Sequence, residues 1–146
     1  MAFELGSDGP DVIVVGLDGS PTSWHATAYA AGLDRRQGSR LVVVYAASAP
    51  MAAGLAPAAS AAIEESLDEV AAALRRELES HPEWTALGGR YRVERGDPFS
   101  ALCRVAEEER ADAVVVGASA QAGHRFVGSL AVRLVRSGRW PVTVVP

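Results

Sequence analysis

Apolar residues occur in short continuous runs that are spaced regularly along the chain. Residues 11–17, 41–46 and 113–116 consist mostly of Val, Ile, Leu and Ala. Continuous runs of this length are typical of strands that are covered on both faces of a sheet. Residues 90–95 alternate charged and apolar side chains, which predicts an edge strand with one wet face. Residues 142–145 predict a fifth strand.

Helical patterns fill the segments between these strands. Ser20 and Pro21 form a capping residue and a first helical position, so they predict a helix that runs to about Gln37. Residues 58–80 place apolar side chains at helical spacing opposite a charged face, which predicts a long amphipathic helix. Shorter helices are predicted over 98–110 and 129–137.

This order of elements predicts the fold class. Strands that alternate with helices form a parallel sheet with right-handed crossovers. We therefore expect a doubly wound α/β domain over residues 11–146, with five parallel strands, helices on both faces and an N-terminal tail over 1–10. Such a sheet binds ligands at the carboxyl ends of its strands, where the winding reverses. The loops over 17–20 and 117–129 are the candidate site.

The segment from Gly117 to the end of the chain has the features of a phosphate-binding site. A strand ends at Gly117, a loop follows, and Gly128 and Ser129 begin a helix. The segment contains four arginines and no Asp or Glu, although the net charge of the chain is −4. N–H groups at a helix start, together with positive potential, favour an anion. We expect the Ser129 hydroxyl, the following N–H at Leu130 and the Arg125 guanidinium to contact phosphate.

Composition excludes several classes of function. The chain has no lysine. This excludes Walker A phosphate binding, Schiff bases with pyridoxal phosphate and general-base catalysis by lysine, because each requires a lysine amine. A single cysteine, Cys103, allows no intrachain disulfide, and we expect it to be a small core residue. The sequence pI of about 5.3 argues against nucleic-acid binding. Residues 41–63 are uncharged but interrupted by proline and glycine, so no membrane span is expected, and the start of the chain lacks a signal-peptide pattern. These features predict a cytoplasmic protein.

Five motifs follow one another over nearly the whole chain, namely Val-Val-Gly-Leu-Asp18-Gly-Ser, Gly96-Asp97-Pro98, Ala-Asp112-Ala-Val-Val-Val-Gly117, Gly128-Ser129 and Pro141-Val-Thr-Val-Val. In this order they resemble the universal stress protein family. The resemblance implies a strand order of 3-2-1-4-5 and a homodimer joined through the fifth strands, here Val142–Val145. Some members bind ATP or a related nucleotide through Gly-x-x-Gly-x9-Gly-Ser/Thr, and others lack that motif and do not bind.

The loop of this chain departs from the nucleotide-binding motif. Gly117, Gly128 and Ser129 match it, but Ala120 replaces the second glycine and only seven residues separate Ala120 from Gly128. Two missing residues shorten the reach of a chain by up to about 7 Å, which is comparable to the length of a diphosphate. Gly123 is expected to take over part of the turn.

Two functions remain open from the sequence. The first is a stress-response dimer that binds ATP, AMP or a cyclic nucleotide, with Mg²⁺ for a triphosphate, and that has no strong catalytic activity, although slow ATP hydrolysis is compatible with it. The second is a related module that has lost nucleotide binding and acts through protein-protein interaction. We expect no catalytic residue and no resident metal. By the resemblance and the loop pattern together, the nucleotide-binding residues are Gly16, Asp18, Ala46, Gly117, Gly123, Arg125, Gly128, Ser129 and Leu130.

Overall fold

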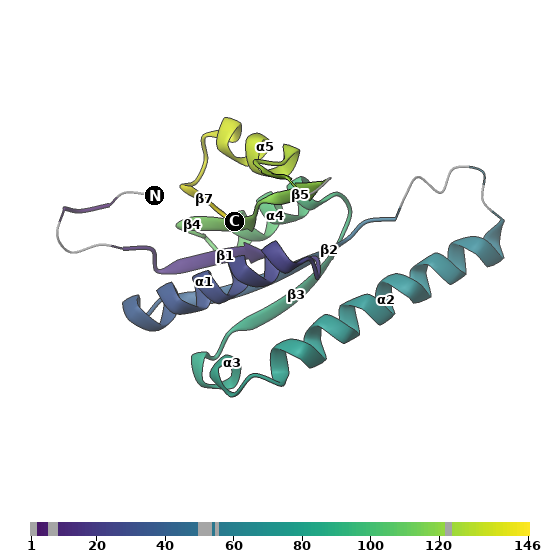
Figure 1. The fold of residues 1–146 in the computed structure, drawn as a ribbon, viewed down its shortest axis with the longest axis horizontal. Coiled ribbons are helices and arrows are strands. Elements are labelled where there is room, and N and C mark those ends of the chain that lie inside the picture. Colours follow the sequence, from purple (N-terminus) through teal and green to yellow (C-terminus); the bar gives the residue numbers. More distant parts are fainter. Residues whose placement is uncertain (1–2, 6–8, 50–53, 55, 122–123) are drawn as a thin grey trace.

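A five-stranded parallel sheet forms the centre of the computed structural model, which describes residues 3–5, 9–49, 54, 56–121 and 124–146. The strands lie side by side in the order β3-β2-β1-β4-β7, so the predicted order 3-2-1-4-5 of the parallel strands is confirmed (Figure 1). Every neighbouring pair in this sheet is parallel. The strands are β1 (Val12–Gly16), β2 (Arg40–Ala47), β3 (Arg90–Arg95), β4 (Ala113–Gly117) and β7 (Val142–Val145).

Local sequence signals set the helix boundaries. The helix α1 (Pro21–Gln37) starts after Ser20, whose hydroxyl accepts from the Ser23 N–H, and ends at Gly38 in the left-handed conformation. These boundaries are those predicted. The sequence analysis did not predict the six-residue helix α3, which a proline begins and Gly88 ends. The other helices are α2 (Pro57–Glu79), α3 (Pro82–Leu87), α4 (Pro98–Glu108) and α5 (Ser129–Ser137).

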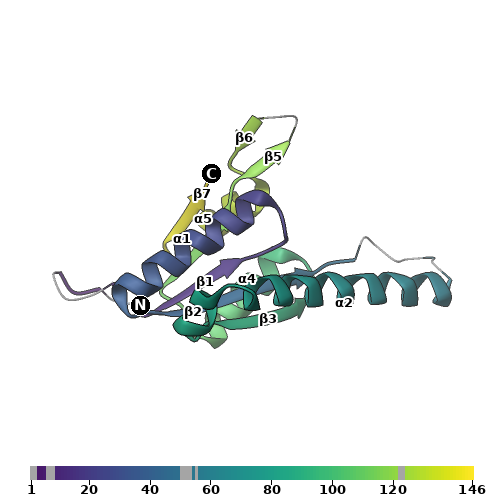
Figure 2. The ribbon, with the colours of Figure 1, turned by 60° about the horizontal axis from the view of Figure 1, so that its bottom comes forward.

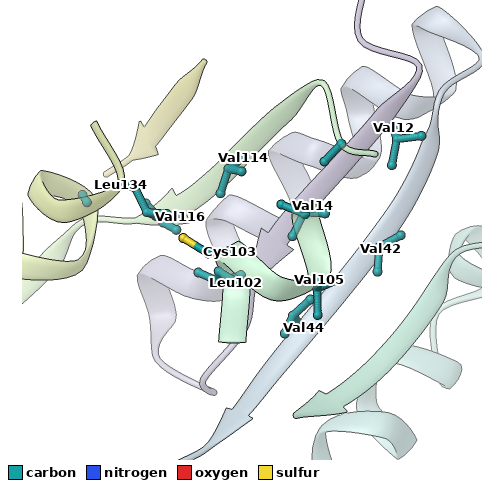
Figure 3. Close-up of a cluster of buried hydrophobic side chains, with 13 residues drawn as sticks. Val12, Val14, Val42, Val44, Leu102, Cys103, Val105, Val114, Val116 and Leu134 are labelled. Carbon is teal, nitrogen blue, oxygen red and sulfur yellow. The ribbon is translucent and has the colours of Figure 1, made fainter. Parts of the chain in front are cut away.

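The two faces of the sheet carry separate hydrophobic cores. Val12 and Val14 of β1 point to one face, where α4 and α5 cover them, and Figure 3 shows this cluster. Ile13 and Val15 point to the opposite face, where α1 and the end of α2 cover them. Successive residues of a strand point to opposite faces, so a continuous apolar run fills both cores. Cys103 is buried in the first cluster, as predicted, and burial raises the pKa of its thiol.

The long helix α2 contacts the core through its C-terminal half and through Leu67 near its midpoint, which is partly buried against the core. Its buried residues are Ala71, Leu74 and Leu78, whereas Val70 is exposed. The N-terminal part of α2 extends beyond the ends of β2 and β3 (Figure 2). Among the described helices, none has the length and apolar content that crossing a bilayer requires.

The predicted loop over 117–129 contains additional structure. Ser119–Gln121 forms β5 and His124–Phe126 forms β6, and the two pair as an antiparallel hairpin. The five predicted parallel strands are therefore confirmed, and the hairpin strands β5 and β6 are additional elements that the sequence analysis did not predict. Each hairpin strand has only three residues, which is too short to produce a recognisable alternation of polar and apolar positions.

Candidate functional site

A cavity of about 680 Å³ lies at the carboxyl ends of β1 and β4. From β1 the order of the sheet proceeds to β2 on one side and to β4 on the other, so the cavity lies at the switch point. The first residues of α1, α4 and α5 also line it. The cavity brings together seven of the nine predicted nucleotide-binding residues, namely Gly16, Asp18, Ala46, Gly117, Gly128, Ser129 and Leu130.

Two predicted residues are not placed in the cavity. Gly123 lies outside the described residues. Arg125 belongs to β6, and its side chain is outside the part of the chain that the structure describes. The contribution of both residues to phosphate binding stays a prediction.

The Asp18 carboxylate is held in place by the turn that follows β1. The Ser20 N–H donates to Asp18 Oδ1 at 2.8 Å, and the Asp18 N–H donates to Ser23 Oγ at 3.3 Å. Burial raises the pKa of Asp18, but hydrogen bonds from Ser20 and Ser23 outweigh it and leave the pKa below its ordinary value. An ionised, oriented carboxylate at this position accepts hydrogen bonds from hydroxyl or amino groups of a ligand.

Two of the helices that begin at the cavity are capped by their own side chains. At α1, Ser20 Oγ accepts from the Ser23 N–H at 3.3 Å. At α4, Asp97 Oδ1 accepts from the Ser100 N–H at 3.2 Å. The hydrogen bonds from Ser100 lower the pKa of Asp97, so this cap is an ionised carboxylate. Each cap satisfies one of the backbone donors that the first turn of a helix leaves free.

The third helix, α5, begins without a side-chain cap. Its N-cap is Gly128, which has no side chain to accept a hydrogen bond. The first bond of the helix runs from the Val132 N–H to the Gly128 carbonyl at 3.1 Å. Among the described residues, the N–H groups of Ser129, Leu130 and Ala131 therefore have no partner, and all three residues line the cavity. Free N–H groups at a helix start bind anions.

Two glycines at the cavity differ in how much space their surroundings leave for a side chain. A Cβ at Gly117 would lie 2.5 Å from the carbonyl carbon of Thr22, so the end of β4 packs against the backbone of α1. A Cβ at Gly16 would instead meet Leu102 Cδ1 at 3.4 Å, which is an ordinary contact. Packing therefore requires glycine at 117 but not at 16, where the missing side chain leaves room for a ligand.

Several lining residues were missed by the sequence analysis. Thr22, Ser23 and Ser119 also line the cavity. Ser119 follows Gly117 by two residues in the candidate loop 117–129, so its position in the sequence could have identified it as a lining residue. Pro98 could also have been identified, because it begins the helix after Gly96-Asp97 at the end of another parallel strand. The apolar lining residues Val44, Leu102 and Val116 gave no signal that distinguished them from other core positions.

The arginines of the C-terminal segment do not gather around the cavity in the described structure. Arg133 lies 3.5 Å from Asp97 Oδ1 and stacks over the Phe99 ring. Arg139 pairs with Glu107 at 2.6 Å. The described lining contains no arginine side chain. Backbone donors at α5 are therefore the positive element of the described cavity.

Within the described ranges, no three His, Cys, Asp or Glu side chains come together in a group that could hold a metal ion. Asp18 is the only carboxylate of the described cavity lining.

Comparisons with known proteins agree with this architecture. The model of the universal stress protein family matches residues 10–146. The chain is similar to the universal stress protein UspA from Lactobacillus plantarum, with 23% identity and a TM-score of 0.78 over 92% of this chain and 97% of that one. It is also similar to a universal stress protein family member from Burkholderia pseudomallei, with 29% identity and a TM-score of 0.66 over 93% and 96% of the two chains.

A third similar structure contains a ligand. It is a universal stress protein in complex with cAMP, with 25% identity and a TM-score of 0.70 over 95% of this chain and 99% of that chain. No curated protein matches the sequence.

Proposed function

The chain belongs to the universal stress protein family, and we propose that it binds an adenine nucleotide in the cavity at the carboxyl ends of β1 and β4. The observation that carries this proposal is the convergence in one cavity of seven residues that the sequence predicted for nucleotide binding. The complex of a similar universal stress protein with cAMP supports it. In this proposal the protein is a stress-response protein whose state depends on its nucleotide.

The cavity offers a polar and an apolar region to such a ligand. Asp18 provides an ionised acceptor for ribose hydroxyls or the exocyclic amine of the base. Val44, Leu102 and Val116 provide apolar surface for the flat face of a base. The free N–H groups at the start of α5 provide donors for phosphate oxygens.

We propose binding without strong catalysis. Phosphoryl transfer depends on groups that orient the attacking nucleophile and neutralise charge on the transferred phosphate. The described lining offers one carboxylate, Asp18, and one imidazole, His25, whose Nδ1 lies 3.1 Å from the Pro146 carbonyl oxygen. If the ligand is ATP, Mg²⁺ would be held mainly through the phosphate oxygens, as this ion usually is.

We also propose that two copies associate through β7. This strand lies at one edge of the sheet and pairs with β4 alone among the described strands. The carbonyls of Pro141 and Val145 accept from Val114 of β4 and from Ala118 directly after it, so the backbone groups of Val142 and Val144 point away from the sheet. A short apolar edge with free backbone groups pairs readily with another strand.

Thermal denaturation with ATP, AMP and cAMP, each with and without Mg²⁺, tests the nucleotide proposal. A ligand at a hundred times its Kd adds about 2.7 kcal/mol to the free energy of unfolding. If no nucleotide at millimolar concentration changes Tm, the proposal fails, and a module that acts through protein-protein interaction takes its place.

Variants locate the site if a shift is observed. Asp18→Ala and Ser129→Ala should reduce the nucleotide-dependent shift of Tm. The first removes the carboxylate that accepts hydrogen bonds from the nucleotide, and the second removes the hydroxyl that contacts its phosphate. Ser137→Ala is the matched control at the other end of α5, where the hydroxyl donates to the Leu134 carbonyl. The control should keep the full shift. An unchanged shift in both site variants would mean that the ligand binds elsewhere.

A further inference from the structure

We infer that the cavity accommodates a single phosphate group, so that it selects a nucleoside monophosphate, linear or cyclic, over the corresponding diphosphate and triphosphate. This inference rests on the proposed function. It follows from which hydrogen-bond donors at the cavity are free, which are already used, and where the charged groups lie.

The free donors match one phosphate in number and position. The N–H groups of Ser129, Leu130 and Ala131 precede the first hydrogen bond of α5 and have no partner among the described residues. The hydroxyl of Ser129 lies at the same helix start, and the Ser119 side chain lies directly against Gly128, where an added Cβ would collide with Ser119 Oγ. A terminal phosphate has three strong acceptor oxygens. One phosphate group therefore uses this set of donors.

Several other described backbone donors of the loop are used within the protein. The Ala118 N–H donates to the Val145 carbonyl at 2.7 Å and so belongs to the parallel sheet. Residues 119–121 pair with 124–126 in the hairpin, and an antiparallel ladder uses the N–H groups of alternate residues on both strands. A loop that wraps a polyphosphate would have to leave its N–H groups unpaired and pointing inward.

The other helix starts at the cavity add negative rather than positive charge. Asp18 lines the cavity as a carboxylate, and Asp97 caps α4 directly before the lining residue Pro98. Arg133, the cation beside Asp97, is already paired with it and stacked over Phe99. A second or third phosphate would bring further negative charge near these carboxylates.

Calorimetric titration of the whole protein with adenosine, AMP, cAMP, ADP and ATP tests the inference, with ADP and ATP measured with and without Mg²⁺. We expect AMP and cAMP to bind at least tenfold more tightly than both adenosine and the two longer nucleotides. Comparison of AMP with cAMP distinguishes the two sources of a single phosphate. If ADP or ATP, free or with Mg²⁺, binds as tightly as AMP, the inference is overturned while the proposed function stands. If adenosine binds as tightly as AMP, the phosphate site is wrong. If no nucleotide binds, the proposed function itself fails, and the inference with it.

A proline variant tests the backbone donors directly. Ser129 is the first helical residue, a position that favours proline, and Gly128 has φ −72° and ψ 170°, which a following proline tolerates. Ser129→Pro therefore removes an N–H and the hydroxyl but keeps the helix, whereas Ser129→Ala removes the hydroxyl alone. We expect AMP affinity to fall about tenfold or more from Ser129→Ala to Ser129→Pro, because a hydrogen bond to a charged group is lost.

Three controls accompany this pair of variants. Circular dichroism verifies that both are folded, adenosine affinity should be the same in both, and Ser137→Ala should bind AMP like the unmodified protein. If Ser129→Pro binds AMP as tightly as Ser129→Ala does, the Ser129 N–H does not contact the phosphate and the inference is overturned.

Discussion

Gly117 packs against Thr22 without space for a side chain. A Cβ at 117 would lie 2.5 Å from the Thr22 carbonyl carbon and 2.6 Å from its oxygen, so the end of β4 directly contacts the first turn of α1. Both atoms belong to the backbone of a helix and cannot move aside as a flexible side chain can. This contact joins the two strand-helix connections that border the cavity.

The first prediction follows from this contact. Gly117→Ala should lower the free energy of unfolding by about 1–3 kcal/mol, because overpacking forces the backbone of α1 away from β4. Urea denaturation measures the change. Gly16→Ala is the matched control, since its added methyl group makes only an ordinary contact with Leu102. The control should keep its stability within about 1 kcal/mol. Equal destabilisation by both variants would contradict this interpretation.

The second prediction concerns Asp34, which is buried in α1 with an exposed fraction of 3%. Among the described residues its Oδ2 has no hydrogen-bond partner, and burial raises the pKa of this carboxyl. A carboxyl with a raised pKa binds its proton more tightly in the folded state, so its ionisation lowers stability as the pH rises above the pKa of the unfolded chain. The carboxylate also lies near the C-terminal end of the helix, where negative charge is unfavourable.

Asp34→Asn should therefore stabilise the protein at pH 7 by about 1–3 kcal/mol, because the amide removes the charge of a buried carboxylate whose hydrogen bonding is incomplete. The gain should become smaller as the pH falls and Asp34 is protonated in both states. Urea denaturation at a series of pH values measures both effects. Asp112→Asn is the control, because Asp112 Oδ2 accepts from the N–H groups of Asp11 and Val12, and this variant should lose stability. A gain that is the same at all pH values would contradict the assignment to charge.

The third prediction concerns Glu109, whose carboxylate binds three arginines beside the edge strand β3. Arg40, Arg90 and Arg92 all donate to it, and the hydrogen bond from Arg40 lowers its pKa most. A lowered pKa in the folded state gives stability that is present above the ordinary pKa of a glutamate and lost as the pH falls below it.

Glu109→Gln should lower stability by about 2 kcal/mol at pH 7, because three guanidinium groups lose the negative charge that they share and one of its two acceptor oxygens. The effect should decrease in acid, where the unmodified protein also loses the charge. Glu79→Gln is the control, since Glu79 is exposed and lies 4.0 Å from Arg75, and it should change stability by less than about 0.5 kcal/mol. If the two variants have the same free energy of unfolding at pH 7, the cluster at Glu109 does not stabilise the fold.

The parallel sheet could be predicted because its strands are long apolar runs that fill two cores at once. Val12 and Val14 face one core and Ile13 and Val15 the other, so no position of β1 before Gly16 tolerates water. The hairpin of β5 and β6 could not be predicted, because it is held by backbone pairing and its sequence has no such pattern. For α2, the sequence identifies an apolar face but not how much of the helix the sheet is long enough to cover.

The candidate site was predicted in part for a similar reason. The switch-point rule brings Asp18 and Ser129 together from topology alone, and the structure agrees. The arginines of the C-terminal segment predicted the position of positive charge less well. Local composition does not show which acidic residue a long side chain reaches. Arg133 and Arg139 reach Asp97 and Glu107, which lie on or beside α4 and far away in the sequence.

The last prediction concerns the edge strand β7. Because the Val142 N–H points away from β4, Val142→Pro removes an outward donor at the first residue of the strand, where proline is tolerated. If β7 joins two copies, this variant should weaken the dimer at least tenfold in sedimentation equilibrium. Val142→Ala is the matched control, because it shortens the same side chain but keeps the outward N–H, and it should leave association unchanged. Circular dichroism verifies that both variants are folded. An unmodified protein that sediments as a monomer, or a Val142→Pro variant that dimerises as before, would contradict association through β7.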